Sequence, residues 1–196
     1  MGPTVGLNRT GWIGGKVFKH TSYETSYNLG AKFKYVLDKR LNMNGYLLYS
    51  GREMDLDENG TVDEKYRYLD IPLTASYEFG NGNIKFYPML GLHNAFLLGG
   101  KATQVVSYDP YETLNYNFFD DYPDTIKAFR YHIGYTAGVG NEFELNHKLR
   151  LFLEARYTRS FVNSLGSSDT TWFDNFGDRA DVGDQEFFSF NVGVLF

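Results

Sequence analysis

Cysteine is absent from the 196-residue chain, which excludes disulfides and thiolate metal sites. No apolar run approaches the roughly 20 residues that a membrane-spanning helix needs. Positive charge is in the minority: 19 Lys and Arg face 24 Asp and Glu, for a net charge of -5. Nucleic acid is therefore excluded as a partner, because phosphate binding needs a concentrated basic surface. A linker rich in Pro and Ser is also missing, so residues 1–196 are expected to form one domain.

What the sequence has is a pattern of period two. In "YLDIPLTASYEFG" (residues 68–80), apolar residues from Leu69 to Phe79 alternate with a polar set that includes Asp70 and Glu78. "YNLGAKFKYVL" and "LRLFLEARY" show the same alternation. A strand points successive side chains to opposite faces, so each segment has an apolar face and a polar face. The pattern predicts an all-β protein.

Eight strands are predicted, near residues 3–14, 23–37, 41–53, 66–79, 84–98, 128–145, 149–162 and 186–196. Short connections around Asp38, Asn81 and Asn146 alternate with four longer ones. This alternation is typical of an eight-stranded antiparallel up-and-down barrel whose termini and tight turns share one rim. Strands of ten or more residues, tilted near 45°, are long enough to cross a bilayer.

The alternating pattern fits two kinds of barrel, a lipocalin-like barrel with a polar exterior and a transmembrane barrel with a polar interior. Aromatic residues near the strand ends favour the transmembrane β-barrel, where they form girdles at the lipid interface. The closing segment "EFFSFNVGVLF" would be an aggregation-prone edge unless barrel closure pairs it with the first strand. Inside a narrow barrel the charges are expected to form a salt-bridge core that blocks a pore, with proton or ion conduction as the alternative. They are Arg130, Glu142, Glu144, Arg150, Glu154 and Arg156.

Longer blocks resemble a known family. "YRYLDIPLTASYEFGNGNIKFYPMLGLHNAFLLGGKAT", "GYTAGVGNEFELNHKLRLFLEARYTRSFVN" and "FFSFNVGVLF" resemble strands of the PorT-like outer-membrane β-barrel proteins of Bacteroidota. The resemblance spans nearly the whole chain. The terminal Phe196 also resembles the sorting signal that outer-membrane assembly machinery recognises, although Asn191 stands where that signal usually has Gly. It implies a Gram-negative outer-membrane barrel with short periplasmic turns, long extracellular loops and periplasmic termini. It also implies contact with lipopolysaccharide and phospholipid, and a role such as an accessory subunit of a secretion or envelope complex. The family has no catalytic residue to carry over.

The N-terminal segment "MGPTVGLN" lacks a basic stretch followed by an apolar core. Either the chain is not exported, or a signal peptide has been removed from it. The outer-membrane interpretation requires the second alternative.

Two of the long connections are rich in aromatic and acidic residues. Aromatic side chains are favoured interface anchors because they bury a large area at modest entropic cost. The loops are therefore predicted either to bind other envelope proteins or to pack on each other over the barrel mouth. The candidate partner-binding residues are Tyr108, Tyr111, Tyr116, Phe118, Phe119, Tyr122, Trp172, Phe173 and Phe176.

One connection, "DLDENGTVDE", has the spacing of a calcium loop. Oxygen ligands at Asp55, Asp57, Asn59 and Asp63 surround a Gly at the position of the sharp turn. The bidentate Glu of an EF-hand is missing, so the alternative is a solvated Asn-Gly turn. Calcium is the one cofactor that the sequence suggests.

An enzymatic alternative rests on His20, Ser22 and Glu24, which alternate and would share one side of an extended segment. Such a set could support acyl transfer on lipid A, but no oxyanion donor can be named. The sequence therefore favours a non-enzymatic barrel whose function is binding, either as a scaffold subunit or as a stand-alone surface barrel.

Overall fold

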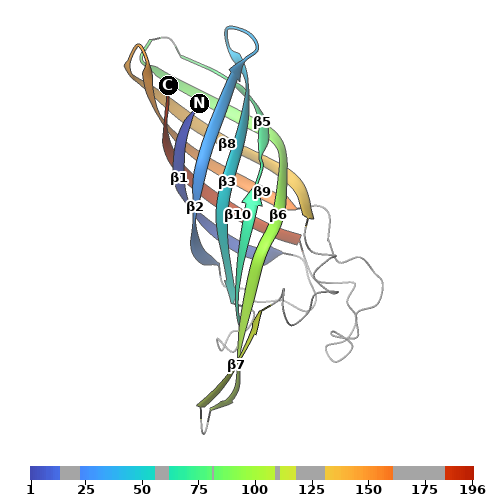
Figure 1. Cartoon of the computed structure of the whole chain (residues 1–196). Helices are drawn as coiled ribbons and strands as arrows, with labels where there is room; N and C mark the ends of the chain where they lie inside the picture. The colour runs from blue at the N-terminus through green and yellow to red at the C-terminus, as the bar shows by residue number, and fades with distance from the viewer. Residues whose placement is uncertain (14–22, 56–61, 81, 109–110, 118–130, 161–183) are drawn as a thin grey trace.

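The computed structural model (Figure 1) describes residues 1–13, 23–55, 62–80, 82–108, 111–117, 131–160 and 184–196. The described residues contain strands and turns. The strands are β1 (Gly2–Ile13), β2 (Glu24–Val36), β3 (Leu41–Asp55), β4 (Val62–Asp70), β5 (Leu73–Tyr77), β6 (Ile84–Tyr108), β7 (Tyr111–Asn117), β8 (Tyr131–Asn146), β9 (Leu149–Ser160) and β10 (Asp184–Leu195). None of the described residues forms a helix long and apolar enough to cross a membrane.

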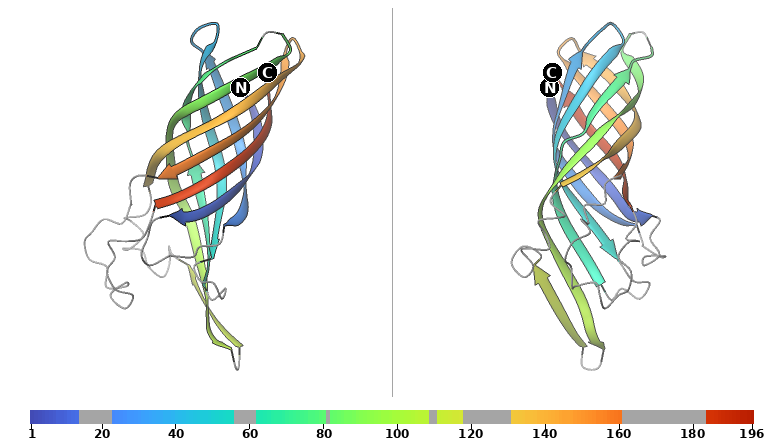
Figure 2. Two further views of the ribbon diagram at one scale, coloured as in Figure 1. Left: turned by 180° about the vertical axis from the view of Figure 1, so that it is seen from behind. Right: turned by 90° about the vertical axis from the view of Figure 1, so that its right-hand side faces the viewer.

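The strands close into one antiparallel barrel. Neighbours follow the order β2-β1-β10-β9-β8-β6-β4-β3, and the pairing of β2 with β3 completes the ring. β5 takes the same place as β4, between β3 and β6, and β7 lies off the ring. The barrel therefore has eight strand positions, as the sequence predicts, and Figure 2 shows the tilted strands from two sides.

Closure joins the two ends of the chain. β1 pairs with β10 from Thr4 opposite Gly193 to Ile13 opposite Asp184. The terminal amine of Met1 donates a hydrogen bond to the carbonyl oxygen of Phe196 over 3.1 Å. The predicted pairing of the closing segment with the first strand is confirmed, and it removes the edge that an unpaired final strand would expose.

The polar face is inside the barrel. On β1 the side chains alternate between exposed and buried, with Val5 and Leu7 more than half exposed and Thr4 and Asn8 buried. The same division holds around the ring, where exposed apolar residues such as Leu29, Leu90 and Phe190 cover the outer wall. An apolar exterior around a polar interior is the transmembrane arrangement, which excludes the lipocalin-like alternative.

The predicted fourth strand, residues 66–79, is wrong in two respects, because it begins earlier, at Val62, and is broken into β4 and β5. Pro72 has no N–H to donate to the ladder, so the regular pairing stops at this residue. The backbone groups there are still satisfied: the Ile71 N–H donates to the Asn94 carbonyl over 2.7 Å, and the Pro72 carbonyl accepts from Tyr46 over 3.0 Å. β3 and β6 keep the same register with β5 as with the end of β4, so the barrel wall stays closed at the break.

The predicted end of the fifth strand at residue 98 is also wrong. β6 continues to Tyr108 and turns back as β7, so part of the expected loop is a hairpin. The continuation "KATQVVSY" carries the β-branched residues that suit a strand, and they extend the pattern past two glycines. In Figure 1 this hairpin lies at the end of the molecule opposite the two termini.

The two rims of the barrel are different. The N- and C-termini and the short connections between β2 and β3, β5 and β6, and β8 and β9 lie at one end in Figures 1 and 2. Gly80 and Gly82 in one of these turns have φ of 103° and 92°, which only Gly adopts readily. We refer to this end as the turn rim and to the opposite end as the loop rim.

Candidate functional site

The interior of the barrel contains an ion pair between Lys32 and Glu154. Tyr46, Tyr87 and Phe152 surround it, and we refer to these three side chains as the cage. Lys32, on β2, is fully buried, and its Nζ lies 2.7 Å from Oε1 of Glu154 on β9. Hydroxyls of Tyr46 and Tyr87 donate to the same carboxylate oxygen over 2.9 and 2.8 Å. The Phe152 ring covers the ammonium group at 4.3 Å from its centre. Three donors to Oε1 and an aromatic ring compensate in part for the water that the two charges lose, while Oε2 of Glu154 is buried without a hydrogen-bond partner in the described structure.

A second group of charges continues from this pair toward the turn rim. Lys34 contacts both carboxylate oxygens of Glu142 at 2.8 Å and also pairs with Glu78. Glu78 accepts a further contact from Lys85 at 2.8 Å. Lys34 on β2 therefore links Glu142 on β8 to Glu78 after β5. These ion pairs hold strands from opposite walls of the barrel together.

A third group crosses the barrel nearer the loop rim. Arg52, on β3, is fully buried, and its guanidinium lies 2.6 Å from Asp70 and donates to Gln185. His93 lies 3.3 Å from the same Asp70 oxygen. The guanidinium is also 4.5 Å from the centre of the Phe187 ring. These side chains obstruct the interior at a second level.

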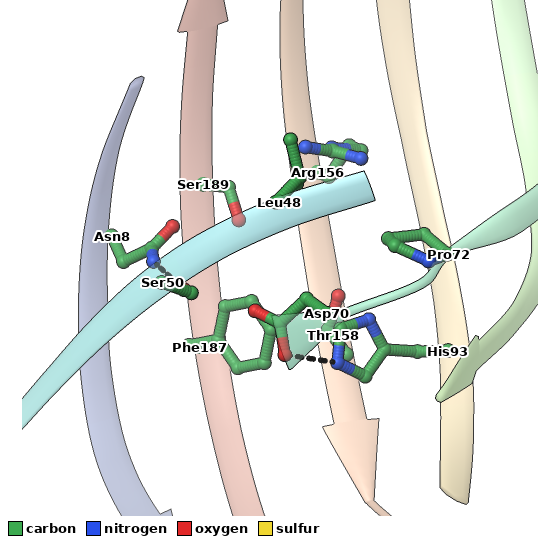
Figure 3. A pocket seen from close by; sticks show the side chains of 10 residues that line it. All are labelled: Asn8, Leu48, Ser50, Asp70, Pro72, His93, Arg156, Thr158, Phe187 and Ser189. Carbon is green, nitrogen blue, oxygen red and sulfur yellow. Dashed lines mark hydrogen bonds and ion pairs between the residues drawn. The ribbon is translucent and has the colours of Figure 1, made fainter. Parts of the chain in front are cut away.

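Between the Lys32 and Arg52 groups lies a small cavity of about 10 Å³, whose lining is drawn in Figure 3. Arg156 lies at one side of it, with its guanidinium carbon 4.4 Å from the centre of the Tyr46 ring. Nε and one terminal nitrogen of Arg156 are buried without a hydrogen-bond partner in the described structure, as is Nδ1 of His93. A cavity of this size holds about one water molecule, so it is not a transport path.

Glycines on neighbouring strands make room for the interior rings. Tyr87 on β6 faces Gly140 on β8, and Phe152 on β9 faces Gly193 on β10. A Cβ atom at Gly140 would lie 2.4 Å from the Tyr87 ring, and one at Gly193 would lie 2.5 Å from the Phe152 ring. Each ring therefore lies directly over the backbone of its partner strand, and the cage around Lys32 depends on both glycines.

A carboxylate on the outer wall is covered near the loop rim. Glu186 on β10 is buried, although its neighbours on the same face, such as Phe188, are exposed. Tyr157 donates to it over 2.5 Å, and Tyr23 donates to its other oxygen. Tyr23 lies directly before β2. The two tyrosines keep this charge from facing lipid directly.

The predicted interior charges lie as follows in the described structure. Glu142, Glu154 and Arg156 are buried within the barrel. Arg150 lies 3.8 Å from Glu142 with its side chain 41% exposed, and Glu144 is half-buried at the turn rim beside His147. Arg130 lies outside the described residues.

The predicted partner-binding residues lie mostly outside the described structure. Tyr108 ends β6, and Tyr111 and Tyr116 belong to β7, so these three are on the hairpin. The other six fall on residues that are not described; they are Phe118, Phe119, Tyr122, Trp172, Phe173 and Phe176.

The predicted calcium and catalytic sets are also only partly described. Asp55 ends β3 and pairs with Asp63 of β4, whereas Asp57 and Asn59 lie outside the described residues. Glu24 begins β2, but His20 and Ser22 lie outside them as well. Among the residues that are described, no cluster of three or more His, Asp or Glu side chains could hold a metal ion.

The sequence did not predict that Tyr46 and Tyr87 would both bind Glu154. Tyr46 and Tyr87 bind Glu154 from β3 and β6, two strands that are far apart in the sequence from β9. The sequence does show that both tyrosines lie on the polar faces of their strands. An aromatic residue at such a position of a barrel strand points inward.

The fold and the interior define a class of protein, a narrow outer-membrane type of barrel with an occluded polar core. The outer membrane protein beta-barrel domain family matches residues 1–166, so the chain belongs to this family. Membership indicates the Gram-negative outer membrane as its location. No curated protein is similar to the chain in sequence.

Solved structures of similar fold are small outer-membrane proteins. OprG from Pseudomonas aeruginosa is 13% identical with a TM-score of 0.50, covering 98% of this chain and 94% of its own. Neisserial surface protein A is 13% identical with a TM-score of 0.48, covering 100% and 95%. The attachment invasion locus protein Ail of Yersinia pestis is 15% identical with a TM-score of 0.44, covering 99% and 95%. At these identities the similarity concerns the fold alone.

Proposed function

We propose that the chain is a non-enzymatic, non-conducting outer-membrane barrel that binds another envelope protein through its loop rim. The barrel anchors and orients the loops, and the loops make the contact. In this proposal the termini and the turn rim are periplasmic, and the loop rim is extracellular. The PorT-like assignment and an origin in Bacteroidota belong to the same proposal and rest on the sequence resemblance.

The observation that carries the proposal is the contrast between a closed interior and an extended hairpin. Large side chains fill the barrel at two levels, around Lys32 and around Arg52, which argues against transport. β6 continues past the barrel ring and pairs with β7 in a hairpin that lies beyond the loop rim in both views of Figure 2. In the part of the chain that is described, β7 pairs with β6 alone, so its second edge can accept a strand from a partner.

A mild-detergent pull-down from native outer membranes tests the binding role. We expect stoichiometric companions with the wild type. We expect their loss when residues 104–114 are replaced by Asn-Gly, which retains the Thr103–Asn115 contact and shortens the hairpin. The variant Trp172→Ala/Phe173→Ala tests the predicted aromatic anchors in the same way. The control Lys39→Gln/Arg40→Gln changes charges on the turn rim and should retain the companions.

Recovery of the wild type as a lone monomer would contradict a subunit role. It would favour the alternative that the chain is a stand-alone surface barrel. If both loop variants still bind the companions, the interface lies on another part of the barrel wall.

The occluded interior makes a separate prediction for conductance. We expect purified protein in a planar bilayer to show no sustained open pore, because buried rings and ion pairs among the described residues cross the interior around Lys32 and around Arg52. Single-channel recording in 1 M KCl measures this directly, with a reconstituted porin as the positive control. Discrete current steps that grow with the KCl concentration would contradict an occluded barrel.

A further inference from the structure

The outer wall at the loop rim carries a cluster of cations, Lys65 and Arg67 on β4 and Lys101 on β6. All three side chains are exposed. Lys65 is the direct cross-strand partner of Lys101, and Arg67 is the partner of Gly99 in the same ladder. We refer to these three residues as the cationic patch.

Like charges directly opposite each other on one face of a sheet are unfavourable. Glu53 on β3 faces Lys65, and the two form an exposed ion pair at 3.3 Å. Among the described side chains, Lys101 and Arg67 form no ion pair with a carboxylate, and the next carboxylate on this face of β4 is Asp63, opposite Thr103. The patch therefore has excess positive charge that an anionic ligand would compensate.

The shape of the wall exposes Arg67 in a fixed position. Its two cross-strand partners are glycines, Gly51 on β3 and Gly99 on β6. A Cβ atom at Gly99 would lie 3.0 Å from a terminal nitrogen of Arg67, so the guanidinium lies flat over the β6 backbone. Small residues on both sides leave the planar donor group open to a ligand that approaches along the wall.

The patch begins where the apolar wall ends. The next pair on the outer face toward the turn rim is Leu69 with Phe96, and the Phe96 and Tyr131 rings lie 5.0 Å apart as part of an aromatic girdle. With a rise of about 3.3 Å per residue and a tilt near 45°, Arg67 and Lys65 lie roughly 5 and 9 Å above Leu69 along the membrane normal. The headgroup layer of a bilayer leaflet is about 5–8 Å thick. The cations are therefore at the height of lipid phosphates.

We propose that Lys65, Arg67 and Lys101 bind the phosphate groups of the outer-leaflet glycolipid, lipopolysaccharide. Arg67 provides the planar fork that suits a phosphate, and the two lysines provide point charges beside it. The acyl chains of the same lipid then lie along the apolar wall below, over Leu69 and Phe96. The assignment of the leaflet rests on the orientation proposed above, and it does not require a protein partner.

Binding of purified bisphosphorylated lipid A to the detergent-solubilised full chain tests the site, with native mass spectrometry as the readout. We expect Lys65→Gln/Arg67→Gln/Lys101→Gln to weaken binding about tenfold or more, because each Lys or Arg near an anionic headgroup contributes separately. The matched control Lys39→Gln/Arg40→Gln/Lys148→Gln removes the same charge from the turn rim and should bind like the wild type. Heat-modifiable migration in gels establishes that both variants are folded.

Three outcomes overturn the inference. Equal binding by the wild type and the patch variant would show that the cations are not the site. If the control variant binds lipid A as weakly as the patch variant, the effect comes from net charge and not from the patch. Phosphatidylglycerol that binds the wild type as tightly as lipid A would assign the patch to phospholipid and reverse the proposed leaflet. A pull-down that finds no protein companion leaves all three results unaffected, so the two proposals fail separately.

Discussion

Replacing Lys32 by Met is expected to lower the free energy of unfolding by about 3–5 kcal/mol, the usual cost of removing one partner from a buried ion pair. Lys32 and Glu154 have no exposed side-chain surface, and their charged atoms lie 2.7 Å apart. Met fills a similar volume but leaves the Glu154 carboxylate without its ammonium partner. Urea titration in detergent micelles, followed by heat-modifiable migration in gels, measures the change.

The double variant Lys32→Met/Glu154→Gln separates the lost charge from the lost packing. Gln still accepts hydrogen bonds from Tyr46 and Tyr87, which both donate to Glu154 in the wild type. We expect the double variant to regain most of the lost stability, because removing both charges of a buried pair is often nearly neutral. Lys148→Met, in the exposed turn after β8, is the control and should change stability by less than about 0.5 kcal/mol. A single variant as stable as the double would contradict a caged ion pair.

The barrel itself could be predicted from the sequence because its pattern is local. Alternation over ten or more residues gives strands, and alternating short and long connections give an up-and-down order. The choice between lipid and water on the apolar face could be made from the aromatic residues at strand ends. These signals depend on neighbours in the sequence, and the structure confirms them.

Two of the errors in strand boundaries have local causes that the pattern hides. Pro72 lies in the middle of a regular alternation, so the alternation does not indicate the break between β4 and β5. The only sign of the break in the sequence is that proline has no N–H to donate. The extension of β6 to Tyr108 follows two glycines, Gly99 and Gly100, which resemble a strand end in the sequence. In the structure Gly99 instead lies beneath the side chain of Arg67, within the ladder.

The interior network and the cationic patch could not be predicted because they depend on register. The sequence places Lys32 and Glu154 on polar faces, but it does not show that β2 and β9 meet across the barrel. Similarly, Lys65 and Lys101 become partners only through the pairing of β4 with β6. Long-range register is set by closure of the whole ring, which no short segment encodes.

The second large effect is expected at Gly140, where the cage depends on a missing side chain. A Cβ atom there would lie 2.4 to 2.6 Å from three atoms of Tyr87, whose side chain is almost completely buried. Gly140→Val therefore forces the ring to move, which breaks its hydrogen bond to Glu154 and its contact with Lys32. We expect a loss of about 3 kcal/mol or more from overpacking combined with an unsatisfied buried carboxylate.

A compensating variant and a matched glycine distinguish this cause from a general cost of valine. In Gly140→Val/Tyr87→Ala the ring is gone, so the valine should cost little beyond Tyr87→Ala alone. Gly45, on β3, has its nearest neighbour 3.5 Å from the Cβ position, an ordinary contact, and Gly45→Val should fold like the wild type. Urea titration of the wild type, Gly140→Val, Tyr87→Ala and the double variant gives the coupling energy between positions 87 and 140 directly. A coupling near zero would mean that Tyr87 can leave the cage freely, and the interior would then be a looser filling than its hydrogen bonds indicate.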